Sequence, residues 1–317
     1  MRQLLVGDNR KTLATLPDGV AQTCVTSPPY WGLRDYGHDD QIGLEQTPDE
    51  YVAQLVEVFR EVRRVLADDG TMWLNLGDSY AGTGKGPSNV GHGRRNGQRL
   101  DGAPAEWIPI PNGLKPKDLV GIPWRVAFAL QADGWYLRSD IIWHKPNPMP
   151  ESVTDRPTSA HEHVFLLSKS KLYFYDADAI REAHEHPELA RNFDRADANA
   201  GRRGDYQKES GRNDGGSHVS GVGFRSDPDK GRNARNVWTI TSKPYKGAHF
   251  ATMPPDLAKR CILAGSRVGD TVLDPFLGSG TTAQCAETLG REWVGCELQP
   301  NYEELIRERT AQRGLGL

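Results

Sequence analysis

Apolar and polar positions form two recurring patterns along the chain, and each pattern predicts one kind of element. Short runs of branched and aliphatic residues predict buried strands, whereas apolar residues three and four apart predict helices with one apolar face. Strands are expected at residues 4–6, 20–25, 71–76, 137–144, 162–167, 271–274 and 292–296, and residues 171–176 could extend the fifth of them. A helix is expected from residue 47 to near residues 69–70, and others at residues 119–133, 254–263, 283–289 and 302–309.

The helix that begins at residue 47 has the clearest start. Thr47 can cap it, Pro48 fits the first turn, and the acids Asp49 and Glu50 lie near the positive end of the helix dipole. Strands and helices alternate throughout the chain, which is typical of a sheet covered by helices on both faces. The order therefore predicts an α/β fold with a mostly parallel, seven-stranded sheet.

Two polar segments interrupt this alternation. Residues 82–118 are rich in glycine, proline and arginine without periodicity, which inside a compact domain indicates a functional or disordered loop. Residues 177–235 are also polar, and residues 191–235 carry ten Lys or Arg against seven Asp or Glu, although the whole chain has a formal charge of −3. This second segment is either a solvated insert or a mobile arm that gains order on a phosphate backbone.

Composition argues against membrane, disulfide-rich and metal-centred proteins. The 317 residues contain no apolar run near the ~18 that span a bilayer, and the first residues lack the pattern of a signal peptide. The four cysteines show no CxxC spacing. The segments 161–163 and 184–186 both read His-Glu-His, but the first would place its histidines on one strand face without an evident third ligand. We therefore expect a protein of a reducing compartment without a metal.

The first candidate site is the segment Thr26-Ser27-Pro28-Pro29-Tyr30, which directly follows the strand at 20–25. Two prolines fix φ and remove two backbone donors, so the strand ends here. The loop then presents a hydroxyl, proline carbonyls and an aromatic ring at the carboxyl end of a strand, where open α/β sheets bind ligands. These groups suit a flat ring that carries an amine, such as a nucleobase. A plain turn that ends a strand could have the same sequence.

The second candidate site is the segment 274–282, Asp-Pro-Phe-Leu-Gly-Ser-Gly-Thr-Thr, which follows a strand and opens a helix. Glu297 lies at the end of the next strand. Glycines that admit a ligand to the backbone, followed ~20 residues later by an acid for ribose hydroxyls, form a nucleotide-binding βαβ unit. The third glycine of a dinucleotide site is missing, and Asp274 would repel a pyrophosphate. An acid at this position suits the cationic amino-acid part of S-adenosylmethionine.

Together the two segments resemble the amino-methyltransferases of DNA. The catalytic signature of that family, [D/N/S]PP[Y/F/W], is matched by residues 27–30, and its cofactor signature, DPFxGSGTT, by residues 274–282. Their order is the circularly permuted one called the β group. The resemblance implies a Rossmann-like, S-adenosylmethionine-dependent methyltransferase fold. Its parts would be a catalytic half at 1–176, a loop-rich, mobile target-recognition insert at 177–235 and a cofactor-binding half at 236–317.

The resemblance also implies roles for individual residues. The catalytic loop would comprise Ser27, Pro28, Pro29 and Tyr30. Asp8 resembles an acidic position near the adenine of the cofactor, and Phe250 belongs to a segment that resembles the lining of the methionine pocket. The other expected cofactor contacts are Thr26, Asp274, Pro275, Phe276, Gly278, Ser279, Gly280, Thr281 and Glu297.

The implied reaction is site-specific methyl transfer from S-adenosylmethionine to the exocyclic amine of a base flipped out of double-stranded DNA. Ser27 and Pro28 would accept the protons of the amine, and Tyr30 would stack on the base. Serine at the first motif position favours cytosine-N4 in this family, and adenine-N6 stays the alternative. DNA contacts are expected from the arginines Arg34, Arg94, Arg95, Arg202, Arg203, Arg212, Arg225 and Arg232.

Three other functions remain as alternatives: a methyltransferase of a protein or RNA amine, an inactive nucleic-acid-binding module, and a nicotinamide oxidoreductase. The glutamine-methylating family of protein methyltransferases has the opposite motif order, which argues against the first alternative. An inactive binding module would not need Ser27, Tyr30, Asp274 and Glu297 together. A nicotinamide oxidoreductase would have a different glycine spacing. The resemblance further implies a bacterial or phage-encoded, cytoplasmic, nucleoid-associated monomer or homodimer. A cognate restriction endonuclease is a candidate partner.

Overall fold

The computed structural model describes residues 1–33, 37–38, 40–82, 94–95, 98–99, 113–184, 231–242 and 253–311, with the backbone alone at 94–95 and 98–99. The chain divides into two units, Met1–Asp176 with Asn236–Leu317, and Ala177–Arg235. These limits coincide with those of the insert expected from the sequence. The role of the insert in target recognition stays a prediction.

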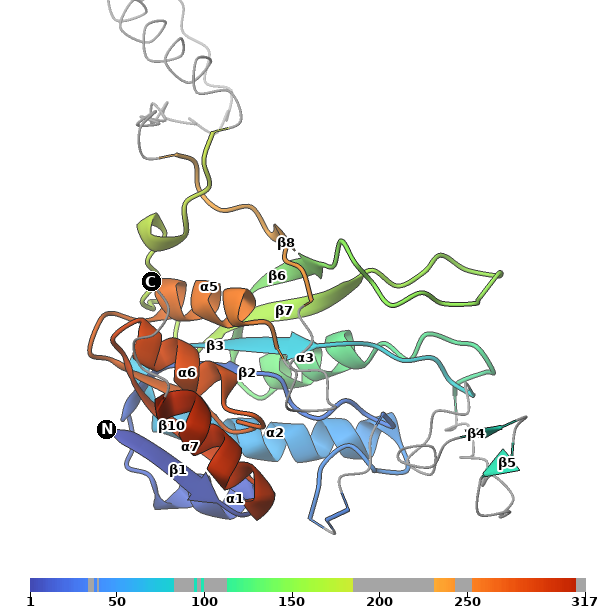
Figure 1. Ribbon diagram of the computed structural model, residues 1–317, viewed down its shortest axis with the longest axis horizontal. Coiled ribbons are helices and arrows are strands. Elements are labelled where there is room, and N and C mark those ends of the chain that lie inside the picture. Colours follow the sequence, from blue (N-terminus) through green and yellow to red (C-terminus); the bar gives the residue numbers. More distant parts are fainter. Residues whose placement is uncertain are drawn as a thin grey trace, which may run out of the picture. The chain divides into compact units, whose positions relative to one another are not determined.

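An eight-stranded sheet forms the centre of the larger unit (Figure 1). In spatial order its strands are β1 (Arg2–Val6), β10 (Glu292–Glu297), β9 (Thr271–Asp274), β2 (Ala21–Thr26), β3 (Leu66–Leu76), β7 (His161–Ser168), β6 (Tyr136–His144) and β8 (Val237–Thr239). Neighbours from β1 to β3 are parallel, β7 is antiparallel to β3 and β6, and β8 is parallel to β6. The predicted α/β fold with a mostly parallel sheet is confirmed, and the edge strand β8 makes one strand more than the seven expected.

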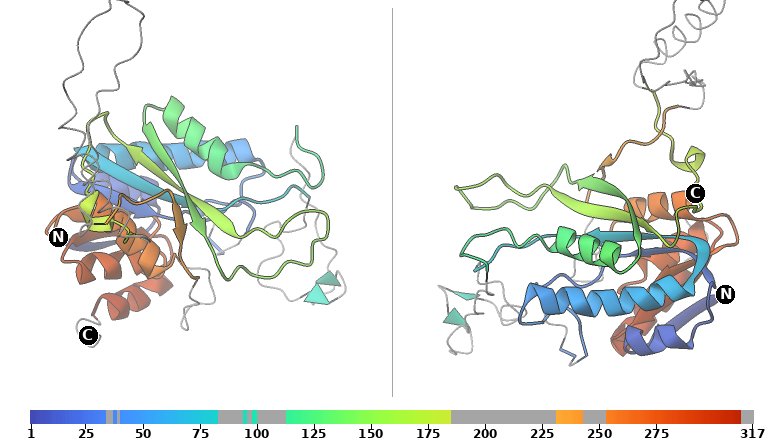
Figure 2. Two further views of the ribbon diagram at one scale, coloured as in Figure 1. Left: turned by 90° about the horizontal axis from the view of Figure 1, so that it is seen from above. Right: turned by 180° about the vertical axis from the view of Figure 1, so that it is seen from behind.

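Helices cover both faces of this sheet (Figure 2). One face carries α1 (Asn9–Thr12), α2 (Pro48–Val65) and α3 (Ile122–Ala132), and the other carries α5 (Pro255–Gly265), α6 (Thr281–Thr288) and α7 (Glu303–Ala311). Short 3₁₀ turns lie at Leu13–Thr15, Asp178–Ile180 and Pro300–Tyr302, and the strands β4 (Arg94–Arg95) and β5 (Gln98–Arg99) pair as a small hairpin. Among the helices that the structure describes, none is long and apolar enough to cross a membrane.

Helix α2 has the start and the apolar face that its sequence predicts. The Thr47 hydroxyl accepts the Glu50 N–H at 3.2 Å, while the Glu50 carboxylate accepts the Thr47 N–H at 3.0 Å. Tyr51, Leu55 and Phe59 project from one face and are fully buried. Burial of each side chain of this size contributes ~1.5–3 kcal/mol to the free energy of unfolding, so this face accounts for much of the stabilisation of α2 on the sheet.

The expected strand extension at residues 171–176 is wrong. The Phe174 N–H donates to the Asp69 carbonyl, and the Asp176 N–H donates to the Ala264 carbonyl, both at 2.9 Å. This segment is therefore tied to the start of β3 and to α5 instead of pairing with a neighbouring strand. The expected end of the first long helix near residues 69–70 is also wrong, because α2 ends at Val65. Strand β3 begins at the next residue, where Leu66 already pairs with Ala21 of β2.

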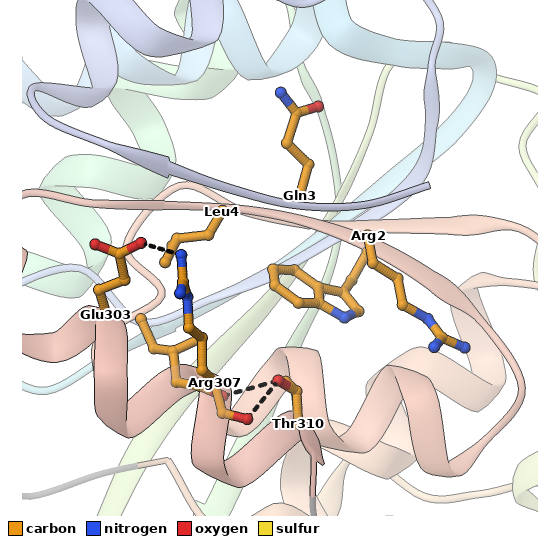
Figure 3. Close-up of a pocket in the computed structure, with 8 residues that line it drawn as sticks. Arg2, Gln3, Leu4, Glu303, Arg307 and Thr310 are labelled. Atoms are coloured by element: carbon orange, nitrogen blue, oxygen red, sulfur yellow. Dashed lines mark hydrogen bonds and ion pairs between the residues drawn. The ribbon is translucent and has the colours of Figure 1, made fainter.

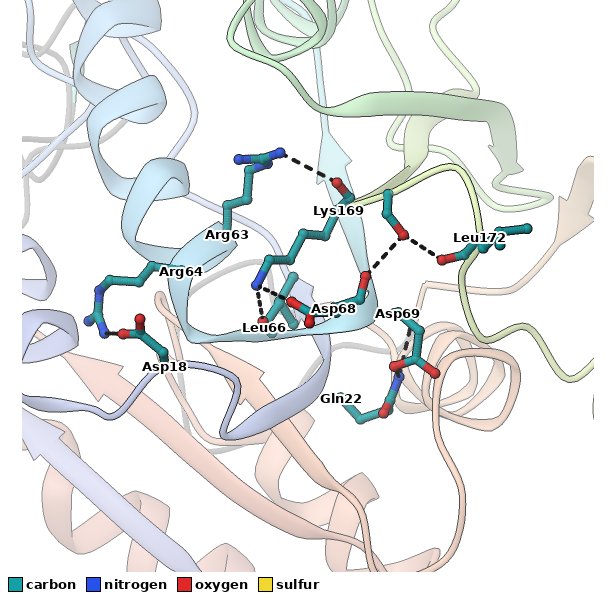
Figure 4. A network of polar contacts seen from close by, with 10 residues as sticks. Asp18, Gln22, Arg63, Arg64, Leu66, Asp68, Asp69, Lys169 and Leu172 are labelled. Atoms are coloured by element: carbon teal, nitrogen blue, oxygen red, sulfur yellow. Dashed lines mark hydrogen bonds and ion pairs between the residues drawn. The ribbon is translucent and has the colours of Figure 1, made fainter.

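A network of polar contacts stabilises the amino ends of β2 and β3 (Figure 4). Arg64 forms an ion pair with Asp18 at 2.5 Å, and Lys169 donates to the Leu66 carbonyl at 2.7 Å. Gln22 donates to the Asp69 carboxylate at 3.0 Å. The network fixes the edge of the sheet opposite to the one where β2 and β9 end.

A surface hollow of about 390 Å³ lies between β1, Trp293 and α7 (Figure 3). Arg307 crosses it and forms an ion pair with Glu303 at 2.6 Å. No residue of the two sequence motifs lines this hollow. The candidate site therefore has to be sought at the ends of the strands.

Candidate active site

The two sequence motifs meet at the carboxyl ends of β2 and β9, which are parallel neighbours in the sheet. The Thr26 hydroxyl, at the end of β2, donates to the Asp274 carboxylate at 2.6 Å, across 248 residues of sequence. Both side chains are buried. The catalytic and cofactor segments predicted from the sequence thus share one hydrogen-bonded strand edge.

Asp274 is a buried carboxyl whose charge is only partly compensated. Its oxygen accepts from Thr26 and from the Phe276 N–H at 3.0 Å. Burial raises the pKa of Asp274 to about 6, although hydrogen bonds from Thr26, Thr282 and the Phe276 N–H oppose this shift. A cation bound beside this carboxyl would favour its ionised form and would in turn be stabilised by it.

The glycine segment turns tightly between β9 and α6. Gly278 and Gly280 have φ of 54° and 83°, which favour glycine, and a Cβ on Gly280 would lie 3.3 Å from Ile306. The Gly278 N–H donates to Glu297 at 2.8 Å, and the second carboxylate oxygen of Glu297 accepts the Gln299 N–H at 2.8 Å. Burial raises the pKa of Glu297 to about 7. Glu297 therefore orients the loop, and its contact with the cofactor stays a prediction.

Two residues that the sequence reasoning missed also hold this loop. Arg309 of α7 is 6% exposed, and its Nη1 donates to the Ser279 carbonyl at 3.0 Å, to the Ser279 hydroxyl at 2.6 Å and to the Thr281 hydroxyl at 3.1 Å. The Asn9 amide donates to the Pro275 carbonyl at 2.9 Å. One feature of the sequence could have indicated a buried role for Arg309. It lies three residues after the buried Ile306, on the same face of α7.

Asp8 lies at the carboxyl end of β1 and caps α1. Its carboxylate accepts the Arg10 N–H at 3.0 Å and the Arg10 Nε–H at 2.9 Å, and it lies 3.6 Å from Lys11. Burial acts to raise the pKa of Asp8, but the Arg10 hydrogen bonds and both positive charges lower it overall. The contact of Asp8 with the cofactor stays a prediction, and the structure adds a capping role.

The catalytic segment is held in place by α2 and by a following loop. The Tyr51 hydroxyl of α2 donates to the Pro29 carbonyl at 2.8 Å, and the Leu33 N–H donates to the Tyr30 carbonyl at 3.2 Å. Gly43 packs on the segment with φ of 111°, where a Cβ would lie 3.3 Å from the Tyr30 carbonyl oxygen. Trp31 packs against the core. The loop is therefore rigid before any ligand arrives.

The Tyr30 side chain is anchored at its hydroxyl, a contact that sequence reasoning missed. The hydroxyl donates to the Glu162 carboxylate at 2.7 Å and lies 3.4 Å from the Asn75 amide oxygen. Burial raises the pKa of Tyr30 well above its ordinary value, and the negative charge of Glu162 adds to this shift. A hydrogen bond with Ser27 acts in the opposite direction. The hydroxyl therefore stays protonated and donates.

The His-Glu-His segment at 161–163 divides between the two faces of β7. His163 pairs with Asp140 at 2.9 Å and its ring centroid lies 5.5 Å from that of Trp124, whereas Glu162 reaches Tyr30. Within the described part of the chain, no group of three or more His, Cys, Asp or Glu could hold a metal ion. Glu162, which the sequence suggested only as a metal candidate, instead joins the catalytic loop.

Most of the expected DNA-binding arginines fall where little is described. In the smaller unit Arg232 pairs with Glu182 at 3.4 Å, and the two residues form an isolated β-bridge. Arg94 and Arg95 lie in the β4–β5 hairpin, where the structure describes the backbone alone. Six predicted site residues lie outside the described ranges: Arg34, Arg202, Arg203, Arg212, Arg225 and the cofactor candidate Phe250.

Comparisons with known proteins match nearly the whole chain. A family model described as DNA methylase matches residues 21–308. The Type II methyltransferase M.SmaI of Serratia marcescens is 46% identical over 311 residues, which cover 98% of this chain and 91% of that protein. The Type II methyltransferase M.Cfr9I of Citrobacter freundii is 46% identical over 309 residues, which cover 96% of this chain and 86% of that protein.

Two solved structures share the fold. A candidate DNA modification methylase of Thermus thermophilus, complexed with S-adenosyl-L-methionine, has a TM-score of 0.59 at 24% identity, covering 100% of this chain and 96% of that one. The cytosine-N4-specific PvuII DNA methyltransferase has a TM-score of 0.62 at 18% identity, covering 98% of this chain and 87% of that one. Since the family model spans both motifs and the relatives match over most of their length, the chain belongs to the DNA methylase family, the amino-methyltransferases of DNA that its two motifs predicted.

Proposed function

We propose that this enzyme methylates the N4 amine of cytosine within a specific sequence of double-stranded DNA. The observation that supports it best is the hydrogen bond of 2.6 Å from Thr26 to Asp274. It joins the end of the segment that would hold the base to the end of the strand that would hold the cofactor. Two reactants bound at these neighbouring strand ends would be brought together without a further change of fold.

The residues of the cofactor segment fit S-adenosylmethionine, which is the methyl donor of this family. Asp274 and Glu297 are buried carboxyls with raised pKa values of about 6 and about 7, so a positively charged ligand would favour the ionised form of each. The loop at Gly278 and Gly280 brings the backbone close to the same place. When bound, the cofactor supplies an electrophilic methyl group on a sulfonium.

The catalytic loop would activate the amine by accepting its protons. The lone pair of an exocyclic amine is delocalised into the ring, so the amine is a poor nucleophile. Hydrogen bonds from the amine to the Ser27 hydroxyl and the Pro28 carbonyl would favour a pyramidal nitrogen with a localised lone pair. Flipping the base costs a few kcal/mol, and stacking on Tyr30 recovers about 1–3 kcal/mol.

Serine at position 27 supports cytosine over adenine as the target. A neutral hydroxyl stands where many adenine-N6 members of the family have aspartate, and the cytosine-N4-specific PvuII enzyme shares the fold. Sequence-specific action is supported by the Type II relatives. The basic residues of the insert at 177–235 would supply recognition, since arginine pairs with guanine edges. A partner endonuclease is part of the proposal.

The test is transfer of a labelled methyl group to duplex DNA by the wild type and by Tyr30→Ala. Digestion to nucleosides and chromatography identify the product, with N4-methylcytosine expected and N6-methyladenine supporting the alternative base. Tyr30→Ala is expected to lose transfer while it still binds S-adenosylhomocysteine. Cofactor binding without transfer to any DNA would falsify the proposal.

A further inference from the structure

Glu162 occupies a position between the catalytic loop and the end of β6. It is the second residue of β7, which lies between β3 and β6 in the sheet. One of its carboxylate oxygens accepts the Tyr30 hydroxyl at 2.7 Å and the Asn75 amide at 3.0 Å, and the other forms an ion pair with Lys145. Its side chain is only 15% exposed. Both carboxylate oxygens of Glu162 are therefore engaged in polar contacts with neighbouring side chains.

Stability alone does not account for this arrangement. Burying a carboxylate and an ammonium costs desolvation that their attraction offsets only in part, so an apolar pair of similar volume would serve the core as well. The network also ends on the one aromatic side chain of the catalytic segment, Tyr30. A polar network with every member satisfied specifies one geometry, and here the specified group is the Tyr30 ring.

The Tyr30 ring is confined by a backbone contact as well as at its hydroxyl. A Cβ added to Gly77, at the end of β3, would lie 2.6 Å from Cε2 and 3.1 Å from Cδ2 of Tyr30. The ring thus lies against bare backbone on one side. Contact at Gly77 and hydrogen bonds at Glu162 together leave the ring one orientation.

We propose that Glu162 is a positioning residue that fixes the Tyr30 ring so that a stacked base presents its amine to Ser27. Lys145 and Asn75 hold the carboxylate for this purpose. The inference rests on the proposed function, because it assumes that the base stacks on Tyr30. Misplacing a reacting group by about 1 Å can cost about 100-fold in rate, so a freed ring should slow the methyl-transfer step.

The experiment is a double-mutant cycle with Tyr30→Phe and Glu162→Gln, measured as the single-turnover rate of methyl transfer on duplex DNA. Tyr30→Phe keeps the ring and removes the hydroxyl, which bonds to Glu162 and also to Ser27. We expect each variant to lose about 10- to 100-fold in rate, and the double variant to lose no more than the worse single one. S-adenosylhomocysteine affinity should be unchanged in all three. Glu151→Gln, which alters an ion pair with Arg156 outside this network, is the matched control.

A second series separates positioning from folding. Glu162→Leu removes both acceptors, whereas Glu162→Gln keeps one for the Tyr30 hydroxyl, so Gln should retain more activity than Leu at equal thermal stability. Losses that multiply in the double variant, or a wild-type rate in Glu162→Gln, would overturn the positioning role while leaving the proposed function intact. An inactive wild type would overturn the proposed function, and the positioning role with it.

Discussion

Replacing Arg309 by methionine should weaken cofactor binding although Arg309 lies outside both sequence motifs. Its Nη1 donates to both oxygens of Ser279 and to the Thr281 hydroxyl, at 2.6–3.1 Å. Methionine has a similar length without charge, so the volume inside the protein is nearly kept. The glycine loop would lose these hydrogen bonds to α7 and keep those of Glu297 and Asn9.

The size of the effect follows from the geometry. The three acceptors share the two protons of one nitrogen, so we count the loss as one charge-assisted hydrogen bond, about 1.5–3 kcal/mol. If the loop must be reordered at this cost when the cofactor binds, Kd rises by about 10- to 150-fold, because 1.4 kcal/mol corresponds to tenfold. Removing a buried charge relieves its desolvation, so the protein should stay folded.

Calorimetric titration with S-adenosylhomocysteine measures this Kd directly. The control is Arg307→Met on the same helix, where the side chain is 75% exposed and pairs with Glu303 at 2.6 Å. That variant should bind as the wild type does. If Arg309→Met binds with wild-type affinity while its thermal unfolding is unchanged, Arg309 does not order the loop and the reasoning fails.

Four further predictions concern Gly77, Glu297 and the start of α2. Gly77→Ala should slow methyl transfer by displacing the Tyr30 ring, while the affinity for S-adenosylhomocysteine is retained. An equal loss of transfer rate and of S-adenosylhomocysteine affinity would contradict a displaced ring. Affinity for S-adenosylhomocysteine should rise as pH increases through about 7, because Glu297 must ionise, and Glu297→Gln should lose this step. The unfolding free energy of the cofactor-free protein should fall as pH rises from 4.5 towards 7, since the pKa of Glu297 is higher folded than unfolded. Thr47→Ala should cost about 0.5–2 kcal/mol in thermal unfolding through loss of the α2 capping box, and an unchanged midpoint would refute it.

The sequence by itself determined the elements and the family. Helix α2 is specified locally, because its capping residues lie three apart and its buried residues recur every three or four positions. The strand that ends at Thr26 is specified by the two prolines that follow. The cofactor and catalytic segments could be recognised because each keeps its functional groups within nine residues or fewer of continuous chain.

Only the tertiary structure decided which distant side chains support these segments. Glu162 and Tyr30 are 132 residues apart, and Arg309 and Ser279 are 30 apart, so no local period relates them. The Arg309 contact depends on the position of α7 beside the loop between β9 and α6. The Glu162 contact depends on the order of β2, β3, β7 and β6 in the sheet and on the face to which each side chain points. In a strand that face alternates with every residue, so a register shift of one would turn Glu162 away from Tyr30 and a histidine towards it. Strand order and register arise from packing of the whole sheet, and this is why the anchor of the Tyr30 hydroxyl could not be found from the sequence alone.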